Sequence, residues 1–105
     1  MENSTESPLD SVHHLAFAVT DVAVSVAWYQ AHFDCAVAYQ DATWALLKFA
    51  NISLALVIPA QHPPHVGFVV DNAAAFGELI THRDGTRSVY VNDPDGNALE
   101  MMARD

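Results

Sequence analysis

Three ionisable residues, His14, His65 and Glu100, lie in short β-prone segments of this sequence. Side chains alternate between the two faces of a strand. The residues that share a face with each ionisable residue are mostly small, whereas the opposite faces carry large apolar residues such as Phe17 and Phe68. Because each ionisable residue lies on a face of mostly small residues, we expect the three side chains to share one site. Two neutral imidazoles and a carboxylate would bind one divalent ion, Fe, Mn, Zn or Ni, with coordination positions left open.

Each residue alone has a simpler explanation, because a strand histidine is more often a hydrogen-bonded structural residue and a terminal glutamate is usually solvated. The internal repeat favours the metal site. His14–Asp21 is similar to His65–Asp71, and each is followed by an alanine-rich segment of helical character, Val22–Phe33 in one case and Asn72–His82 in the other. Asp21 and Asp71 are the expected N-caps of these helices.

Hairpin segments follow each expected helix. They are Asp34–Gln40, Thr43–Ala50 and Ile52–Ile58 in the first half, and Thr86–Asn92 and Ala98–Met102 in the second. The sequence therefore predicts an α+β fold of two βαβββ modules, in which the second module lacks or shortens one strand. Asp93-Pro94-Asp95-Gly96 is a turn signal that should join the last two strands.

The expected organisation is a mobile N-terminal tail over 1–11, a first module over 12–58, a proline-rich linker over 59–64 and a second module over 65–103. At 105 residues the chain forms one domain. Thirteen acidic and four basic residues give a net charge of −9, which disfavours nucleic acid and membrane partners. With Cys35 as the only cysteine, no intrachain disulfide can form. The acidic segment Met1–Asp10 does not resemble a secretory signal, so we expect a cytoplasmic protein.

The patterns His14-x6-Asp21, His65-x5-Asp71 and Asp93-Pro-Asp-Gly-Asn-Ala-Leu-Glu100 resemble the vicinal oxygen chelate superfamily, which includes glyoxalase I, extradiol dioxygenases and bleomycin-binding proteins. The resemblance covers about Val12 to Ala103. It implies a paired βαβββ fold whose cupped mixed sheets surround a metal, with His14, His65 and Glu100 at the ligand positions of the first, fifth and eighth strands. It also implies a small substrate that chelates the metal through two oxygens.

Two positions refine what the resemblance implies. Aligning Asn51 with Asn97 puts Leu54 at the fourth-ligand position of glyoxalase I, and leucine can neither ligate nor move a proton, so glyoxalase I isomerase activity is disfavoured. Leu54 would instead form an apolar wall of the substrate pocket. Tyr90 lies ten residues before Glu100, as in the thiol transferase and dioxygenase branches, and could act as an acid or hydrogen-bond donor. A buried strand tyrosine with a satisfied hydroxyl is an equal alternative.

Other residues are candidates for the pocket. Trp44 would line an apolar substrate wall or pack in the core, and Arg87 could orient an anionic group of the substrate. Strand alternation turns His13 to the face opposite His14. For His62 and His82, solvated or capping roles are expected.

The leading hypothesis is a small metal-dependent enzyme of lyase, transferase or dioxygenase type that acts on a small molecule. The alternative is a non-catalytic protein that binds a drug or metabolite, which the negative charge would suit if the ligand is cationic. A third option is an accessory domain that keeps a metal without a reaction. Because a shortened second module would leave an exposed sheet edge, we expect a homodimer, in which His14 of one subunit could join His65 and Glu100 of the other.

Overall fold

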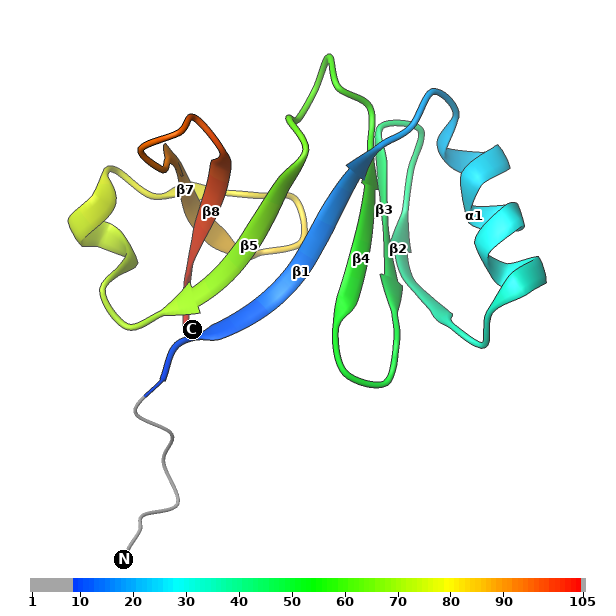
Figure 1. Ribbon diagram of the computed structural model, residues 1–105, viewed down its shortest axis with the longest axis horizontal. Coiled ribbons are helices and arrows are strands. Elements are labelled where there is room, and N and C mark those ends of the chain that lie inside the picture. The colour runs from blue at the N-terminus through cyan, green and yellow to red at the C-terminus, as the bar shows by residue number, and fades with distance from the viewer. Residues whose placement is uncertain (1–8, 105) are drawn as a thin grey trace, which may run out of the picture.

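A computed structural model describes residues 9–104 of the chain, which fold as one curled sheet with a single α-helix (Figure 1). The elements in chain order are β1 (Ser11–Ala18), α1 (Val22–His32), β2 (Ala36–Gln40), β3 (Trp44–Lys48), β4 (Ser53–Val57), β5 (His65–Val70), the 3-10 helix η1 (Ala73–Phe76), β6 (Ile80–Thr81), β7 (Arg87–Asn92) and β8 (Ala98–Ala103). The predicted α+β class is confirmed.

The sheet repeats one pairing pattern in its two halves. The strand order is β2-β3-β4-β1-β5-β8-β7-β6, so β1 and β5 are the central strands. β1 pairs parallel to β4, and β5 pairs parallel to β8 in the same way. The two halves meet through the antiparallel pairing of β1 with β5. The two modules therefore pair within one chain.

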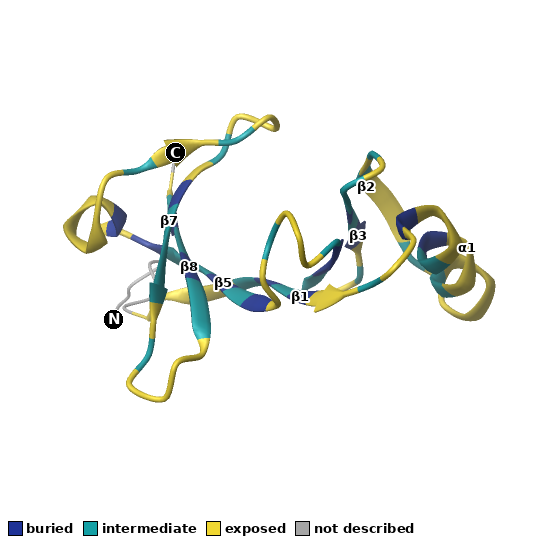
Figure 2. Cartoon of the chain, turned by 90° about the horizontal axis from the view of Figure 1, so that it is seen from above, coloured by how far each residue is buried: buried dark blue, intermediate teal, exposed yellow. Residues whose placement is uncertain are grey.

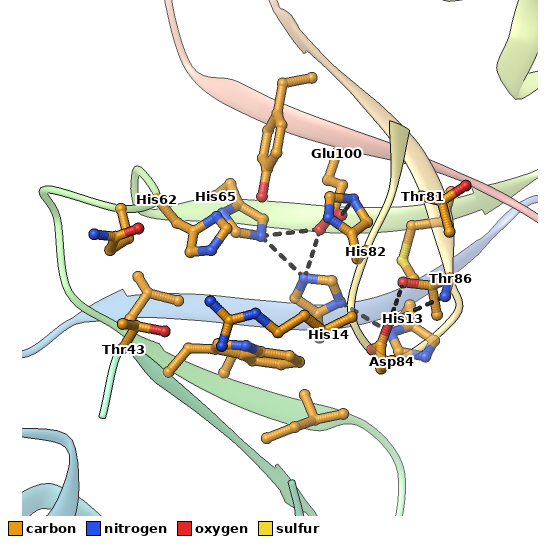
Figure 3. A pocket seen from close by; sticks show the side chains of 18 residues that line it. His13, His14, Thr43, His62, His65, Thr81, His82, Asp84, Thr86 and Glu100 are labelled. Atoms are coloured by element: carbon orange, nitrogen blue, oxygen red, sulfur yellow. Dashed lines mark hydrogen bonds and ion pairs between the residues drawn. The ribbon is translucent and has the colours of Figure 1, made fainter. Parts of the chain in front are cut away.

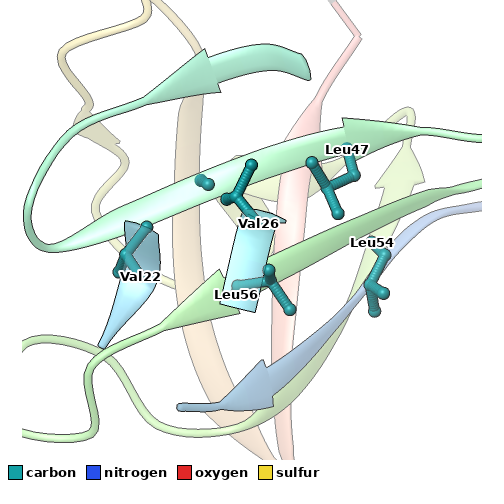
Figure 4. Packing of buried hydrophobic residues seen from close by; sticks show 6 residues of the cluster. Val22, Val26, Leu47, Leu54 and Leu56 are labelled. Carbon is teal, nitrogen blue, oxygen red and sulfur yellow. The ribbon is translucent and has the colours of Figure 1, made fainter. Parts of the chain in front are cut away.

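Helix α1 covers the outer face of the first half. Its N-cap is Asp21, as predicted, and the Asp21 side chain accepts a hydrogen bond of 3.2 Å from the Val24 amide. Val22 and Val26, one helical turn apart, are buried against strand residues of β3 and β4. The cluster consists of Val22, Val26, Ala45, Leu47, Leu54 and Leu56 (Figure 4). This cluster is the main core of the first half.

The second half has no corresponding α-helix, so the predicted helix Asn72–His82 is wrong. Only the four residues of η1 are helical, and Gly77 follows them with a φ of 153°, which an L side chain rarely adopts. The chain then extends into the two-residue strand β6. The alanine run is too short before this break to nucleate an α-helix. Asp71 caps no helix either and forms an ion pair with Arg104.

The predicted hairpin between β7 and β8 is confirmed. Asp93 accepts from the Asp95 and Asn97 amides at 2.9 Å each, which closes the turn between the two strands. The expected tail over 1–11 falls mostly outside the described residues, since these begin at Leu9 and β1 begins at Ser11. Within residues 9–104 no helix is long and apolar enough to cross a membrane. Seen from above, the buried residues run along the sheet and along the side of α1 that faces it (Figure 2).

Candidate metal centre

Strand register places the three predicted ligands together. His14 of β1 pairs with Gly67 of β5, and Gly67 pairs with Glu100 of β8, so His14 and Glu100 flank the same glycine. His65 lies two residues before Gly67 on β5 and therefore projects from the same face. The three adjacent strands β1, β5 and β8 thus bring all three side chains to one point.

The ligand atoms converge tightly (Figure 3). His14 Nε2 lies 3.0 Å from His65 Nε2, and each of these nitrogens lies 3.1 Å from Glu100 Oε1. All three residues are buried, with exposed fractions of 6%, 8% and 6% for His14, His65 and Glu100. Among the described residues, these three side chains have ligand atoms close enough together to hold one metal ion. The chain assembles this group by itself, without a residue from a second subunit.

The hydrogen bond at Nδ1 of His65 implies a cation between Nε2 of His65 and Oε1 of Glu100. His65 Nδ1 lies 2.7 Å from the Pro63 carbonyl oxygen, which can only accept, so Nδ1 carries the ring proton. In the neutral ring, Nε2 then presents a lone pair to Glu100 Oε1, which is also an acceptor. Only a bound proton or a metal ion makes this approach favourable. A backbone carbonyl on the far nitrogen is also the usual partner of a metal-ligating histidine.

Two imidazole nitrogens and one carboxylate oxygen would fill three coordination positions of a divalent ion and leave others open for further ligands. This donor set suits Fe, Mn, Zn or Ni.

A cavity of about 320 Å³ adjoins the three ligands. The three ligands and Tyr90 line one part of its wall, and another part of the wall is apolar. The apolar side is formed by Trp44, Leu46, Ala55 and Val57. The volume is that of a pocket for a small organic molecule.

Comparison with known proteins identifies the fold of this chain. No protein-family model matches the sequence, and no curated protein matches it. A hypothetical protein from Bacillus halodurans is similar in structure, with a TM-score of 0.72 at 11% identity, and the match covers 91% of this chain and 95% of that one. A glyoxalase/bleomycin resistance protein/dioxygenase superfamily member from Vibrio splendidus gives a TM-score of 0.63 at 15% identity, over 90% and 99% of the two chains.

The chain has the vicinal oxygen chelate fold. A Legionella pneumophila protein named NAD-dependent benzaldehyde dehydrogenase is also similar, with a TM-score of 0.61 at 17% identity over 86% of this chain and 96% of that one. At these identities the similarity establishes the architecture, and the chemistry has to be derived from the site itself.

The position of Leu54 in this vicinal oxygen chelate fold corrects the sequence alignment. Leu54 is buried in the core under α1 and does not line the pocket. The repeat equates Ala16 with Gly67; Gly67 pairs with Glu100, and Ala16 pairs with Ala55. Ala55 is therefore the symmetric counterpart of Glu100. Aligning Asn51 with Asn97 was wrong by one residue, and one residue exchanges the two faces of a strand.

Tyr90 and Trp44 both line the pocket. Tyr90 is directly opposite Glu100 on β7, and its ring meets the His65 ring edge to face at 5.0 Å. Burial, together with the Glu100 charge, raises the pKa of the Tyr90 hydroxyl, which therefore stays protonated and can donate a hydrogen bond. Trp44 stacks on Tyr39 at 4.5 Å.

Arg87 does not line the pocket, and the corresponding prediction is wrong. On β7 the side chains of Ser88 and Tyr90 face the site, so alternation turns Arg87 to the other face. The cation at the pocket is Arg83, which binds Asp41 of the first half at 2.8 Å. Arg83 lies in a turn rather than a strand, so no face could be assigned to it from the sequence.

Strand alternation also misplaced His13, which was expected on the face opposite His14. His13 lines the pocket because the register of β1 shifts between Val12 and His14, a bulge that defeats simple alternation. Its Nδ1 lies 2.9 Å from His14 Nδ1. Burial and the neighbouring His14 lower the pKa of the His13 ring. His62 and His82 also line the pocket. His62 lies in the expected linker and His82 at the end of the expected helix, so strand alternation gave no signal for either residue.

Ser88 was missed as well. It is 1% exposed, and its hydroxyl donates to Glu100 Oε2 at 2.6 Å. Burial alone would raise the pKa of the Glu100 carboxyl, but its polar contacts with His14, His65 and Ser88 outweigh burial and hold that pKa well below its usual value. Glu100 is therefore a carboxylate at neutral pH, as a metal ligand must be.

Proposed function

We propose that this chain is an enzyme that binds one divalent metal ion through His14, His65 and Glu100 and acts on a small organic substrate that chelates the ion through two oxygens. The observation that carries the proposal is the triangle of ligand atoms, 3.0 to 3.1 Å apart, at the wall of a 320 Å³ cavity. A bound ion would supply Lewis-acid chemistry, or dioxygen chemistry if it is iron.

The residues around the triangle support a bidentate substrate. Ala16 and Ala55 are small and buried, and they leave space on the first-half side beside His14. Trp44 and Leu46 extend that side as an apolar surface for the body of the substrate. The Tyr90 hydroxyl, kept protonated by burial, can donate to a substrate oxygen or to a leaving group.

The same residues disfavour glyoxalase I chemistry. That isomerisation needs a carboxylate on each side of the ion to move a proton, and the symmetric counterpart of Glu100 is Ala55. Lyase, transferase and dioxygenase reactions need no second carboxylate and are the proposed classes.

The first experiment measures metal content and turnover. Purified protein loaded separately with Fe(II), Mn(II), Zn(II) and Ni(II) is tested against catechols, hemithioacetals and epoxides with a thiol. We expect one metal per chain and turnover of one substrate class that His65→Ala abolishes. Protein that binds no stoichiometric metal under any of these conditions would overturn the proposal.

A second candidate is a protein that sequesters a small cationic molecule without turnover. The net charge of −9 favours it, because an acidic protein attracts cations. Metal-free protein that binds a cationic ligand in the pocket, with unchanged affinity in His65→Ala, would favour this candidate.

We also propose a homodimer. Within residues 9–104, β2 and β6 each pair on one side only and leave the sheet edges open. Light scattering after size-exclusion chromatography that gives only the monomer mass would contradict it.

A further inference from the structure

The buried polar side chains of residues 9–104 are His14, His65, Glu100 and Ser88. The first three are the proposed ligands. Ser88 remains, and a buried hydroxyl needs a partner. Its partner is Glu100 Oε2, the oxygen that His14 and His65 do not contact, at 2.6 Å.

A third side chain fixes the direction of this hydrogen bond. His82 Nε2 lies 2.6 Å from Ser88 Oγ. The serine hydroxyl has one proton, and it is donated to the carboxylate, so Ser88 Oγ must accept from His82 and Nε2 of His82 carries a proton. The order of donation is therefore His82 to Ser88 to Glu100. His82 Nε2 also lies 3.5 Å from Glu100 Oε2.

The backbone holds both donors in place. Ser88 pairs with Met102 on β8, diagonal to Glu100 and on the same face. His82 begins a tight turn in which its amide donates to the Thr86 carbonyl at 2.8 Å and its carbonyl accepts from Gly85 at 3.0 Å. Arg83, next in sequence, ties this turn to Asp41 of the first half.

We infer that Ser88, supported by His82, is a positioning residue that holds Glu100 Oε2 away from the ion, so that Glu100 ligates through Oε1 alone. The inference rests on the proposed metal site. A carboxylate can ligate through one oxygen or both. Single-oxygen ligation would leave one more coordination position open than two-oxygen ligation, and a chelating substrate needs two open positions.

The test uses cobalt(II), whose visible spectrum reports coordination number, and the full chain. Wild-type protein is titrated first, and stoichiometric binding is required by the proposed function. Ser88→Ala should weaken cobalt affinity about 10- to 100-fold, in the range seen for partners of metal ligands. Its cobalt spectrum should also change, because the freed carboxylate can turn toward the ion.

Two variants serve as controls. Ser53→Ala makes the same change on β4, at the residue paired with His14, and should alter neither affinity nor spectrum. Ser88→Thr keeps the hydroxyl and should restore the wild-type spectrum. If Ser88→Ala does not fold, His82→Ala replaces it, since the His82 side chain is 23% exposed, and its spectrum should change in the same direction.

The possible failures are distinct. Wild-type protein that binds no cobalt overturns the proposed function and this inference together. Wild-type protein that binds cobalt while the Ser88→Ala or His82→Ala spectrum and affinity stay unchanged overturns the positioning role alone. Loss of all cobalt absorption in His82→Ala, with Ser88→Ala unchanged, would instead make His82 a ligand.

Discussion

The imidazole of His14 occupies the space that a side chain at Gly67 would need. A Cβ built on Gly67 would lie 2.2 Å from His14 Cε1 and 2.6 Å from Nδ1. Real atoms do not approach so closely, so the absence of a side chain on β5 is what lets His14 reach across that strand toward Glu100. The site therefore depends on a residue that has no ligand atom of its own.

Gly67→Ala should displace the His14 ring. We expect metal affinity to fall at least tenfold, and the free energy of unfolding to fall by about 1–3 kcal/mol, as for other overpacked sites. Competition with a chelating dye and urea denaturation measure the two effects.

A double-mutant cycle supplies the control for this substitution. In His14→Ala the space beside Gly67 is free, so adding Gly67→Ala to that variant should cost little stability. An equal cost in both backgrounds would mean that the strain lies in the β5 backbone and that the His14 ring is not its cause.

Metal should also stabilise the fold. An ion that binds only the folded chain, present at about 100 times its dissociation constant, adds about 2.7 kcal/mol. For a domain of this size that is a rise in Tm of roughly 10–20 °C. Differential scanning fluorimetry with and without a chelator measures it, and His65→Ala should show no rise. A similar rise in His65→Ala would place the metal elsewhere on the chain.

The opposite faces of β4 give a third prediction. Ala55→Glu would add a carboxylate at the position symmetric to Glu100, and we expect metal affinity to increase about tenfold because a fourth ligand becomes available. Leu54→Ala instead removes core packing under α1 and should cost about 2–5 kcal/mol of stability without changing metal affinity. Metal titration and urea denaturation of both variants measure these effects. A rise in affinity for Leu54→Glu but not for Ala55→Glu would restore the original alignment.

The sequence predicted the features that follow from periodicity. Alternation in β1, β5 and β8 placed His14, His65 and Glu100 on one side, and the Asp93 turn predicted the last hairpin. Each of the three ligands lies on a regular strand whose two faces are marked by apolar and by small residues, whereas the hairpin follows from its turn-forming residues.

The failures lie where regular geometry is interrupted. The bulge before His14 brings His13 to the pocket. The segment from Asn51 to Ala55 is one residue longer than the segment from Asn97 to Glu100, so Ala55 takes the position that the alignment gave to Leu54. His82 and Arg83 lie in a turn fixed by backbone hydrogen bonds and by a contact with a distant segment. Local patterns carry no information about such long-range contacts.

The last prediction concerns Asp41, which anchors this turn from the first half. Its carboxylate accepts from the Tyr39 hydroxyl, from the Thr43 hydroxyl and amide, from the Trp44 amide and from Arg83. The Tyr39 bond, followed by the Thr43 and Trp44 bonds, holds the pKa of Asp41 well below its usual value.

A carboxyl whose pKa is lower in the folded than in the unfolded chain adds stability above its unfolded pKa, about 3.9, and that stability is lost as the pH falls through the folded pKa. Asp41→Asn should therefore lower the free energy of unfolding by about 1 kcal/mol, a value kept small by solvent screening, with a constant difference between pH 5 and pH 8. Below about pH 4 the two proteins should converge.

Arg83→Ala is the matched control for Asp41→Asn. Its side chain is 71% exposed, so the ion pair alone should contribute less than the hydrogen bonds within the first half. Urea denaturation at pH 3, 5 and 8 measures all three proteins. A difference between wild type and Asp41→Asn that grows as the pH falls would contradict the lowered pKa. A larger loss in Arg83→Ala than in Asp41→Asn would make the bridge between the halves, rather than the Asp41 turn, the main source of stability.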